Sequence, residues 1–530
     1  MNRYRSTLAS SSWLRIGVIA TAMGLGAVTV HASAPKVPAG NVAWVPAAVD
    51  ADIDSAFARA KAEKKPIFLY WGATWCPPCN QLKATLFNRQ DFAERSKLFV
   101  AVHIDGDRPG AQKLGTRFKV RGYPTVILFS PDGQEITRLP GEADAQQVMA
   151  VLDAGLAGGR SVRAVLADVR AKKGLTANEW RMLGYYSWAQ DEEIVRAADR
   201  PALLAQLATA SPDAAVATRL WLKALSESDD GKGIRADAAL RERVQRMLLD
   251  VQASRVQADT IVYGSARIVR ALTAEGSPER DPLVRAYEGA LRRLEADASL
   301  SRADRLSALA ARVELARLDV PAEEASKPKL PPALLTDVRT VVARADREIT
   351  DGYERQAVIT SAADVMRRAG LLVDSDTLLK GNLTKSHSPY YLMSMLAGNA
   401  KARNDIPDAL RWYEEAFNRS EGPATRLQWG STYFVNVVDL TEKDAARIER
   451  VAAQLIKESA SDPSAYYERS ARSMQRVGAK LMQWNKSGQH AAVIQRLQTQ
   501  LDAVCVKLPT ADAQRAACES VFKAPGKPAA

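Results

Sequence analysis

After residue 40, the hydrophobic pattern alternates between helix-like and strand-like segments. Residues 53–64 place Ile53, Phe57 and Ala60 on one face, which predicts an amphipathic helix. Residues 66–71 form an unbroken apolar run, as expected of a buried central strand. The following segments predict further strands over 98–104, 126–129 and 134–139, and further helices over 112–118 and 144–156. Residues 40–157 are therefore predicted to form an α/β domain.

The pattern changes after Gly158-Gly159. From about residue 160 to 523 the chain is rich in Ala, Leu, Arg and Glu at helical spacing, and clear strand alternation is missing. The segment Val320–Pro332 contains four prolines, which is typical of a linker between helices. We therefore expect a long all-α region in two blocks, residues 160–320 and 333–523.

The candidate chemistry lies where the apolar strand ends, in Trp75-Cys76-Pro77-Pro78-Cys79. Two cysteines separated by two residues can close a disulfide across the first turn of a helix, here expected to run to about residue 97. This geometry leaves the first sulfur exposed and the second shielded. The helix N-terminus stabilises a thiolate, so Cys76 is predicted to be the nucleophile.

A structural disulfide or half of a zinc site is the alternative interpretation of this motif. Zinc requires further ligands, and no second Cys-x-x-Cys or paired histidine follows in the sequence. The motif therefore favours redox chemistry at Cys76 and Cys79, with neither a metal nor another cofactor.

The order of these segments and the Cys-Pro-Pro-Cys motif resemble the thioredoxin fold over residues 40–157. The segment Gly122-Tyr123-Pro124-Thr125 resembles the loop that, in this fold, carries a cis proline facing the disulfide. The resemblance implies that Tyr123 and Pro124 position the backbone of a substrate strand, and that Trp75 shields one side of the site. The segments 60–67 and 86–92 are most similar to the thioredoxin-like domain of periplasmic disulfide reductases.

Three positions depart from the family pattern. Tyr70 and Ala101 stand where thioredoxins bury an aspartate and a lysine, and Asn80 follows the second cysteine in place of lysine. We therefore expect no buried charge pair to carry the proton of Cys79. The two residues between the cysteines, Pro77 and Pro78, include no histidine and offer no backbone N–H to a thiolate. This composition favours a reducing to intermediate reduction potential.

The helical region resembles tetratricopeptide repeats in two places. Residues 180–184 match the opening of a first helix, and residues 390–418 match a whole unit, with Ala409, Tyr413 and Ala416 at the second helix's small and aromatic positions. An α-solenoid with a tetratricopeptide-like unit near 390–420 and an irregular helical bundle both remain open. Four tryptophans are expected either in the core or on a client-binding surface, namely Trp180, Trp188, Trp412 and Trp429.

A second cysteine pair, Cys505 and Cys518, flanks a helix break at Leu508-Pro509. In an oxidising compartment this spacing favours a structural disulfide between two terminal helices. The alternative is a second redox pair that exchanges with Cys76 and Cys79.

The N-terminal 32 residues predict export. Arg3, Arg5 and Arg15 precede an apolar run over 16–30, and Ala32 offers a cleavage site, as in a secretory signal peptide. The expected location is the periplasm, and an uncleaved anchor in the inner membrane is the alternative, although the run is short for a membrane span.

The charge balance changes this picture little. The net charge is +12, but Lys and Arg alternate with Asp and Glu, so we expect a solvated helical surface and no nucleic-acid partner. The sequence therefore predicts an exported thiol:disulfide oxidoreductase. Its partners would be client proteins with cysteines, held by the helical region, and a membrane electron donor or oxidant. The competing interpretation is a non-catalytic scaffold in which the helical region carries the function.

Overall fold

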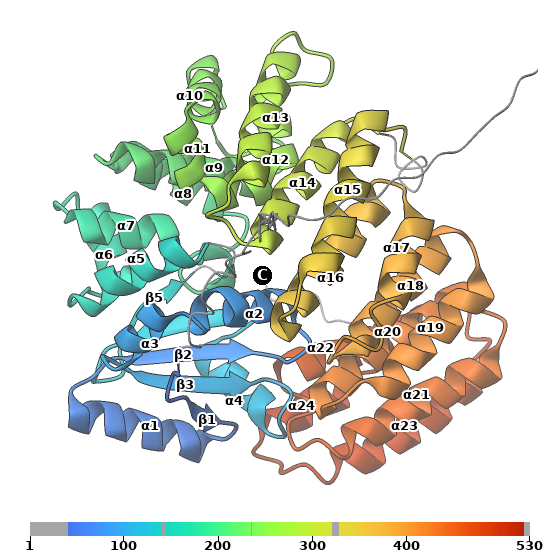
Figure 1. Ribbon diagram of the computed structural model, residues 1–530. Coiled ribbons are helices and arrows are strands. Elements are labelled where there is room, and N and C mark those ends of the chain that lie inside the picture. The colour runs from blue at the N-terminus through green and yellow to red at the C-terminus, as the bar shows by residue number, and fades with distance from the viewer. Residues whose placement is uncertain (1–40, 140, 142–143, 235, 321–327, 524–530) are drawn as a thin grey trace, which may run out of the picture. The chain divides into compact units, whose positions relative to one another are not determined.

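The apolar runs of the N-terminal region pair into a five-stranded sheet in the computed structural model (Figure 1). The model describes residues 41–139, 141, 144–234, 236–320 and 328–523, so the predicted signal peptide lies outside the described residues. The strands have the order β1-β3-β2-β4-β5. Their bounds are Val45–Ala47 for β1, Ile67–Gly72 for β2, Val100–Asp105 for β3, Thr125–Phe129 for β4 and Glu135–Leu139 for β5.

The pairing confirms the predicted central strand. All six residues of β2 are buried, and β2 runs parallel to β3 and antiparallel to β4. Strand β1, which also runs parallel to β3, was not predicted because three residues are too few for a periodic signal. Strand β5 pairs antiparallel with β4 at the other edge.

Alternate residues of β2 face two different cores, as the twofold period of a strand requires. Leu69 and Trp71 pack with α1 (Asp50–Glu63) and α4 (Ala111–Phe118), while Phe68 and Tyr70 face the opposite side. The second face is covered by the helices that follow the cysteine motif and by the closing helix. These are α2 (Pro77–Leu82), the π-helical turn η1 (Lys83–Phe87), α3 (Gln90–Ser96) and α5 (Ala145–Leu156).

The helix expected to run from the cysteine motif to residue 97 is interrupted, which corrects the prediction. Asn88 ends η1, and Arg89 has extended backbone angles before α3 begins. The Asp91 carboxylate accepts a hydrogen bond from the Phe92 N–H and pairs with the Arg89 guanidinium. These local polar contacts favour a new helix start over continuation of the old one.

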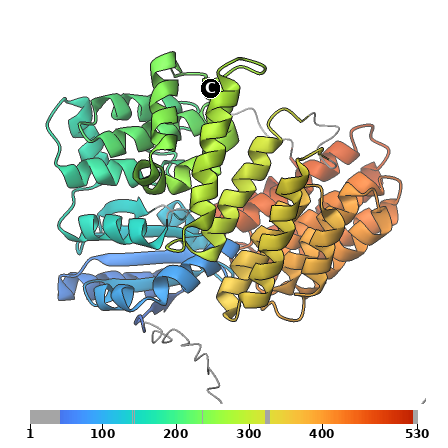
Figure 2. The same cartoon turned by 45° about the horizontal axis from the view of Figure 1, so that its top comes forward.

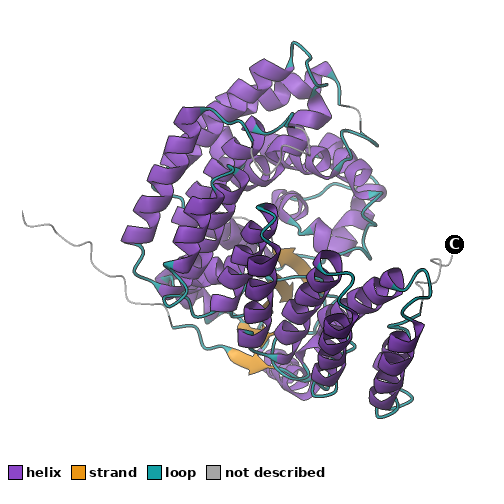
Figure 3. Cartoon of the chain, turned by 90° about the vertical axis from the view of Figure 1, so that its right-hand side faces the viewer, coloured by secondary structure: helices purple, strands orange, loops and turns teal. Residues whose placement is uncertain are grey.

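The rest of the described chain is helical, as predicted (Figure 3). In the first block the helices are α6 (Val162–Arg170), α7 (Ala177–Tyr185), the 3-10 turn η2 (Trp188–Gln190), α8 (Arg200–Ala210), α9 (Ala214–Glu227), α10 (Ala238–Leu249), α11 (Val251–Val256), α12 (Ala258–Leu272), α13 (Arg280–Ala296) and α14 (Arg302–Ala316). In the second they are α15 (Pro332–Glu348), α16 (Gly352–Arg368), α17 (Leu372–Lys380), α18 (Pro389–Ala402), α19 (Ile406–Arg419), α20 (Pro423–Leu440), α21 (Ala445–Ser459), α22 (Glu468–Trp484), α23 (Ala491–Cys505) and α24 (Ala513–Glu519).

The fold class predicted from the sequence, an α/β thioredoxin-like domain followed by a long all-α region, is thereby confirmed. Helices α18 and α19 pack against each other and bury Ala409 and Ala416, the small residues of the predicted tetratricopeptide-like unit. That repeat assignment and the predicted domain boundaries stay predictions. Among the described helices, none combines the length and the apolar character needed to span a membrane.

The helical region packs directly on one face of the α/β domain. The core that contains Phe68 and Tyr70 continues into α14, α16, α18 and α20, whereas the core on the α1 side of the sheet is separate. Helix α16 packs against α2 on this face, while α22 also reaches α4 on the α1 side of the sheet (Figure 1). Figure 2 shows the same arrangement after a turn of 45°. The covered face is the one that carries the cysteine motif.

Candidate active site

The Cys-Pro-Pro-Cys turn lies between the end of β2 and the start of α2. Cys76 is the N-cap residue of α2, and its Sγ accepts a hydrogen bond from the Cys79 N–H at 3.3 Å. Cys76 and Cys79 form a disulfide with their Cα atoms 5.2 Å apart. Pro77 and Pro78 occupy the first helical positions, where the missing N–H groups have no partner to lose within the helix.

Asn80 holds the turn in place, a role that the sequence did not reveal. Its side chain is fully buried, and Nδ2 donates hydrogen bonds to the carbonyl oxygens of Thr74 at 2.8 Å and Cys76 at 2.9 Å. In the sequence, Asn80 stands out only as a departure from the family pattern. Its position directly after Cys79 is the one feature of the sequence that indicates a role at the turn.

The predicted exposure of the first sulfur is wrong. Cys76 is 2 % exposed and Cys79 is fully buried. The turn lies in the core shared with the helical region, where α16 packs against α2, and the helical region also holds the neighbouring Trp75. Its Nε1–H is 2.8 Å from both Asp107 Oδ2 and Thr425 Oγ1, and its carbonyl oxygen accepts a hydrogen bond from Gln356 Nε2 at 3.3 Å.

Arg469 of α22 completes this cover. Its guanidinium forms an ion pair with Asp107, and it lies 5.2 Å from the ring centroid of Trp75 and 4.9 Å from that of Tyr123. The Arg469 backbone N–H also donates to Gln112 Oε1 at 3.0 Å. An arginine from the far end of the sequence therefore contacts both aromatic residues predicted at the substrate surface.

The predicted substrate loop adjoins the same cover. The Tyr123–Pro124 peptide bond is cis, as the family resemblance implies. The Tyr123 hydroxyl accepts a hydrogen bond from Gln112 Nε2 at 2.8 Å, and burial raises its pKa. The Pro124 carbonyl accepts a hydrogen bond from Gln190 Nε2 at 3.2 Å. The Tyr123 hydroxyl and the Pro124 carbonyl thus have partners within the chain.

Beneath the disulfide, Tyr70 and Ala101 are buried on the same side of the sheet as Cys79. Two charged groups that the sequence analysis missed lie nearby, and burial shifts both towards neutrality. Burial raises the pKa of the Asp105 carboxyl, with a further contribution from Asp107, and burial lowers the pKa of the Lys83 ammonium. Lys83 follows Cys79 by four residues, a spacing that the sequence shows, whereas the pairing of Asp105 with Gly72 across the sheet is visible only in the structure.

The other predicted residues are distributed elsewhere. Trp180, Trp188, Trp412 and Trp429 are all buried, so the core alternative applies, and of the four Trp429 contacts Trp75 with ring centroids 5.2 Å apart. Cys505 and Cys518 form a disulfide between α23 and the short helix α24. Within the described ranges no group of three or more His, Cys, Asp or Glu side chains is arranged to hold a metal ion.

The sheet order, the cysteine turn and the cis-proline loop define a thioredoxin-like protein. Residues 53–156 match the family model of a thioredoxin-like domain. A thioredoxin-like protein of Synechocystis sp. is 33% identical over 85 residues, which cover 16% of this chain and 76% of that protein. The chain therefore belongs to the thioredoxin-like family through its N-terminal domain.

Longer relatives match this chain over a part of their length. Thiol:disulfide interchange protein DsbD 1 of Pseudomonas aeruginosa is 28% identical over 127 residues, or 23% of this chain and 21% of that protein. The chain thus spans about a fifth of that relative's length. A solved structure described as a DsbH oxidoreductase has 18% identity and a TM-score of 0.20, covering 24% of this chain and 92% of the other.

Proposed function

We propose that the protein is an exported thiol:disulfide oxidoreductase that acts through Cys76 and Cys79. The observation that carries the proposal is the cysteine pair at the start of α2, with the Cys79 N–H directed at the Cys76 sulfur in a thioredoxin-like domain. The names of the relatives that describe thiol:disulfide interchange support the same activity. The relatives also favour a periplasmic location and partners with cysteines.

Thiol exchange defines the roles of the two sulfurs. In the reducing direction the Cys76 thiolate attacks a client disulfide, forms a mixed disulfide and releases one client thiol. The Cys79 thiolate then attacks Cys76, which frees the second client thiol and restores the Cys76–Cys79 disulfide. In the oxidising direction the same steps run backwards, and in either direction a second partner, proposed to be membrane-bound, must reset the pair.

The cover over Trp75 imposes a condition on protein clients. Cys76 is almost fully buried, and Tyr123 and Pro124 already have partners within the chain. A client strand that pairs at Tyr123 must therefore displace Arg469 and Gln190. In this proposal, client binding to the helical region supplies the free energy for that displacement.

The test is the reduction potential of Cys76–Cys79 in the full chain, measured by equilibration with glutathione and thiol trapping. A value near about −250 mV or lower identifies a reductant, and one near about −120 to −180 mV identifies an oxidant or isomerase. A Cys79→Ala variant should also trap clients as mixed disulfides. A pair that never equilibrates and a variant that traps nothing would refute the proposal.

The burial of Cys76 also favours a second candidate function, that of a non-catalytic scaffold. In that case the disulfide stays closed and the helical region binds partners by itself. A Cys76→Ser variant would then bind the same proteins as the wild type, whereas under the first proposal it would lose its covalent complexes.

A further inference from the structure

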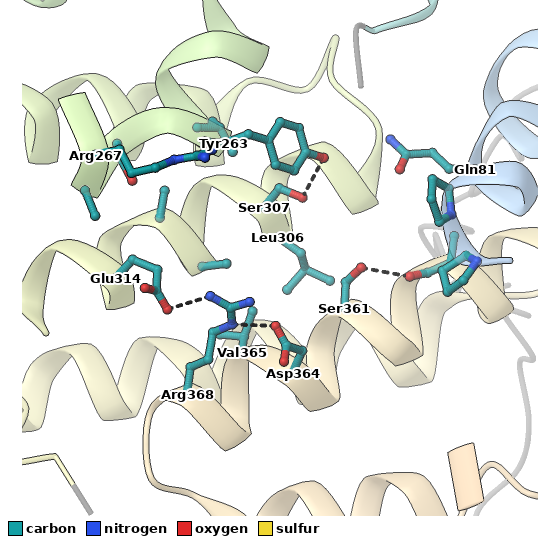
Figure 4. A pocket seen from close by; sticks show the side chains of 18 of the residues that line it. Gln81, Tyr263, Arg267, Leu306, Ser307, Glu314, Ser361, Asp364, Val365 and Arg368 are labelled. Atoms are coloured by element: carbon teal, nitrogen blue, oxygen red, sulfur yellow. Dashed lines mark hydrogen bonds and ion pairs between the residues drawn. The ribbon is translucent and has the colours of Figure 1, made fainter. Parts of the chain in front are cut away.

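A cavity of about 480 Å³ lies against the outer side of the Cys-Pro-Pro-Cys turn. Pro77, Pro78 and Gln81 line it on the thioredoxin-like side, and helices α12, α14 and α16 line the remainder (Figure 4). Its size falls within the roughly 300–1,000 Å³ typical of small-molecule sites. A small ligand in this cavity would therefore lie against Pro77 and Pro78, the two residues between Cys76 and Cys79.

The cavity is lined on one side by an ionic group in which both carboxylates are paired with an arginine. Arg368 lies between two carboxylates, at 2.7 Å from Glu314 Oε1 and 2.6 Å from Asp364 Oδ2 (Figure 4). Both carboxylates are therefore engaged by a guanidinium of their own wall. This arrangement leaves them poorly available to bind a cationic ligand.

The opposite wall carries positive charge with no carboxylate partner among the described residues. Arg267 and Arg270 of α12 are exposed and line the cavity. Each donates to a backbone carbonyl, Arg267 to Tyr263 at 3.4 Å and Arg270 to Leu318 at 2.9 Å. A guanidinium has five N–H donors in a planar fork, so both arginines keep donors for a carboxylate.

We propose that this cavity binds a small thiol, or its disulfide, that carries carboxylate groups, and that this compound exchanges with Cys76. The inference rests on the proposed function and adds a small compound that can reset the cysteine pair besides the membrane-bound partner. The cavity size sets the class of ligand as small, and the two arginines without a carboxylate partner select carboxylates. The position of Pro77 and Pro78 between the two cysteines selects sulfur chemistry. Arg267 and Arg270 are binding residues in this scheme.

The exchange takes place in two steps. One small thiolate attacks the Cys76 sulfur, the Cys76–Cys79 bond breaks, and Cys79 leaves as a thiolate. A second small thiolate attacks the sulfur of the first, which releases the Cys76 thiolate and a small disulfide. Two small thiols lose two electrons and the protein disulfide gains them, and the reverse sequence oxidises the protein.

The experiment compares small disulfides of different charge as oxidants of the reduced full chain. The probes are glutathione disulfide, which is anionic, hydroxyethyl disulfide, which is neutral, and cystamine, which is cationic. Their rates are normalised to their rates with free cysteine. We expect glutathione disulfide to react fastest, and Arg267→Gln/Arg270→Gln to slow it about tenfold without slowing hydroxyethyl disulfide.

Arg243→Gln/Arg246→Gln is the matched control, because these residues are also exposed and three positions apart, but on α10 and outside the cavity lining. Salt should slow glutathione disulfide selectively, which provides a readout that needs no variant. Equal normalised rates for the three probes, or an equal effect of both double substitutions, would overturn the inference alone. If hydroxyethyl disulfide also fails to oxidise Cys76 and Cys79, the proposed function fails with it.

Discussion

The two disulfides of this chain are alike in burial and differ in what surrounds them. In both pairs each cysteine is at most 2 % exposed, and the Cα atoms are 5.2 Å apart in one pair and 5.6 Å in the other. Trp75, next to Cys76 in the chain, is contacted by polar groups from both regions, namely Asp107, Thr425 and Arg469. Burial alone therefore does not distinguish the pair proposed to be reactive from the pair predicted to be structural.

The surroundings of Cys505–Cys518 are different in kind. This pair joins α23 to α24, and the chain beyond α24 approaches α22 so closely that a Cβ on Gly478 would lie 1.8 Å from the Val521 carbonyl oxygen. Such a contact fixes the last helices against their neighbour. We infer that an incoming partner can replace the polar contacts near Cys76–Cys79. Cys505–Cys518 is instead held by close packing within the chain.

The largest expected effect is on thiol exchange. Cys76→Ser should abolish exchange with disulfide substrates, because the nucleophilic sulfur is lost, while Cys505→Ala/Cys518→Ala should leave it intact. The measurement is the rate of insulin disulfide reduction with dithiothreitol as the electron source. Loss of activity in the C-terminal variant, with its fold retained by circular dichroism, would instead assign Cys505 and Cys518 to the redox path.

The second effect is on stability. Here removal of Cys505–Cys518 should have the larger effect, whereas removal of Cys76 has the larger effect on thiol exchange. Removing Cys505–Cys518 opens a loop with a sequence separation of 13, against 3 for Cys76–Cys79. Chain-entropy scaling predicts a loss of about 3 kcal/mol for the first and about 2 kcal/mol for the second. Urea unfolding of Cys505→Ala/Cys518→Ala and Cys76→Ala/Cys79→Ala measures both. Equal or inverted losses would contradict the structural role of the C-terminal pair.

Local features of the reactive pair were predictable from the sequence, and its cover was not. The strand into the turn, the cysteine spacing and Pro124 are all encoded within a few residues, where steric and hydrogen-bonding rules act directly. Thr425 and Arg469 meet Trp75 and Asp107 across separations of 350 and 362 residues. Hydrophobic periodicity predicts that a helix has a buried face, but does not specify which surface that face covers.

The third effect concerns this cover and is smaller. Gly422, just before α20, has a φ of +85°, and a Cβ there would lie 2.8 Å from the Cβ of Asp107. Gly422→Ala should therefore move α20 away from Asp107 and Trp75, at a cost of about 1–3 kcal/mol. In a Cys79→Ala background, where Cys76 stays a free thiol, iodoacetamide should alkylate Cys76 several-fold faster.

Gly398→Ala is the control for this substitution. Gly398 lies within α18, and a Cβ there meets nothing within 4 Å, so alanine should be tolerated and slightly stabilising. Alkylation of Cys76 should then match the parent variant. If both alanine variants leave the alkylation rate unchanged, the contact between α20 and Asp107 does not limit access to Cys76.

The smallest expected effect is on the pH dependence of stability, and it concerns a histidine in the sheet beneath Cys76–Cys79. His103 of β3 stacks on Tyr70 with ring centroids 5.0 Å apart, and burial lowers its pKa to about 4. In the unfolded chain the pKa is about 6.5, so the unfolded state binds more protons between these values. The stability that neutral His103 contributes is therefore complete above about pH 6.5 and falls towards pH 4.

His103→Phe should lessen this fall by on the order of 1 kcal/mol at pH 5, measured by urea unfolding at pH 7 and pH 5. His490, which stacks on Trp484 far from the sheet, provides the matched His490→Phe control. An equal change in both variants would show that the acid sensitivity does not arise beneath the cysteine turn.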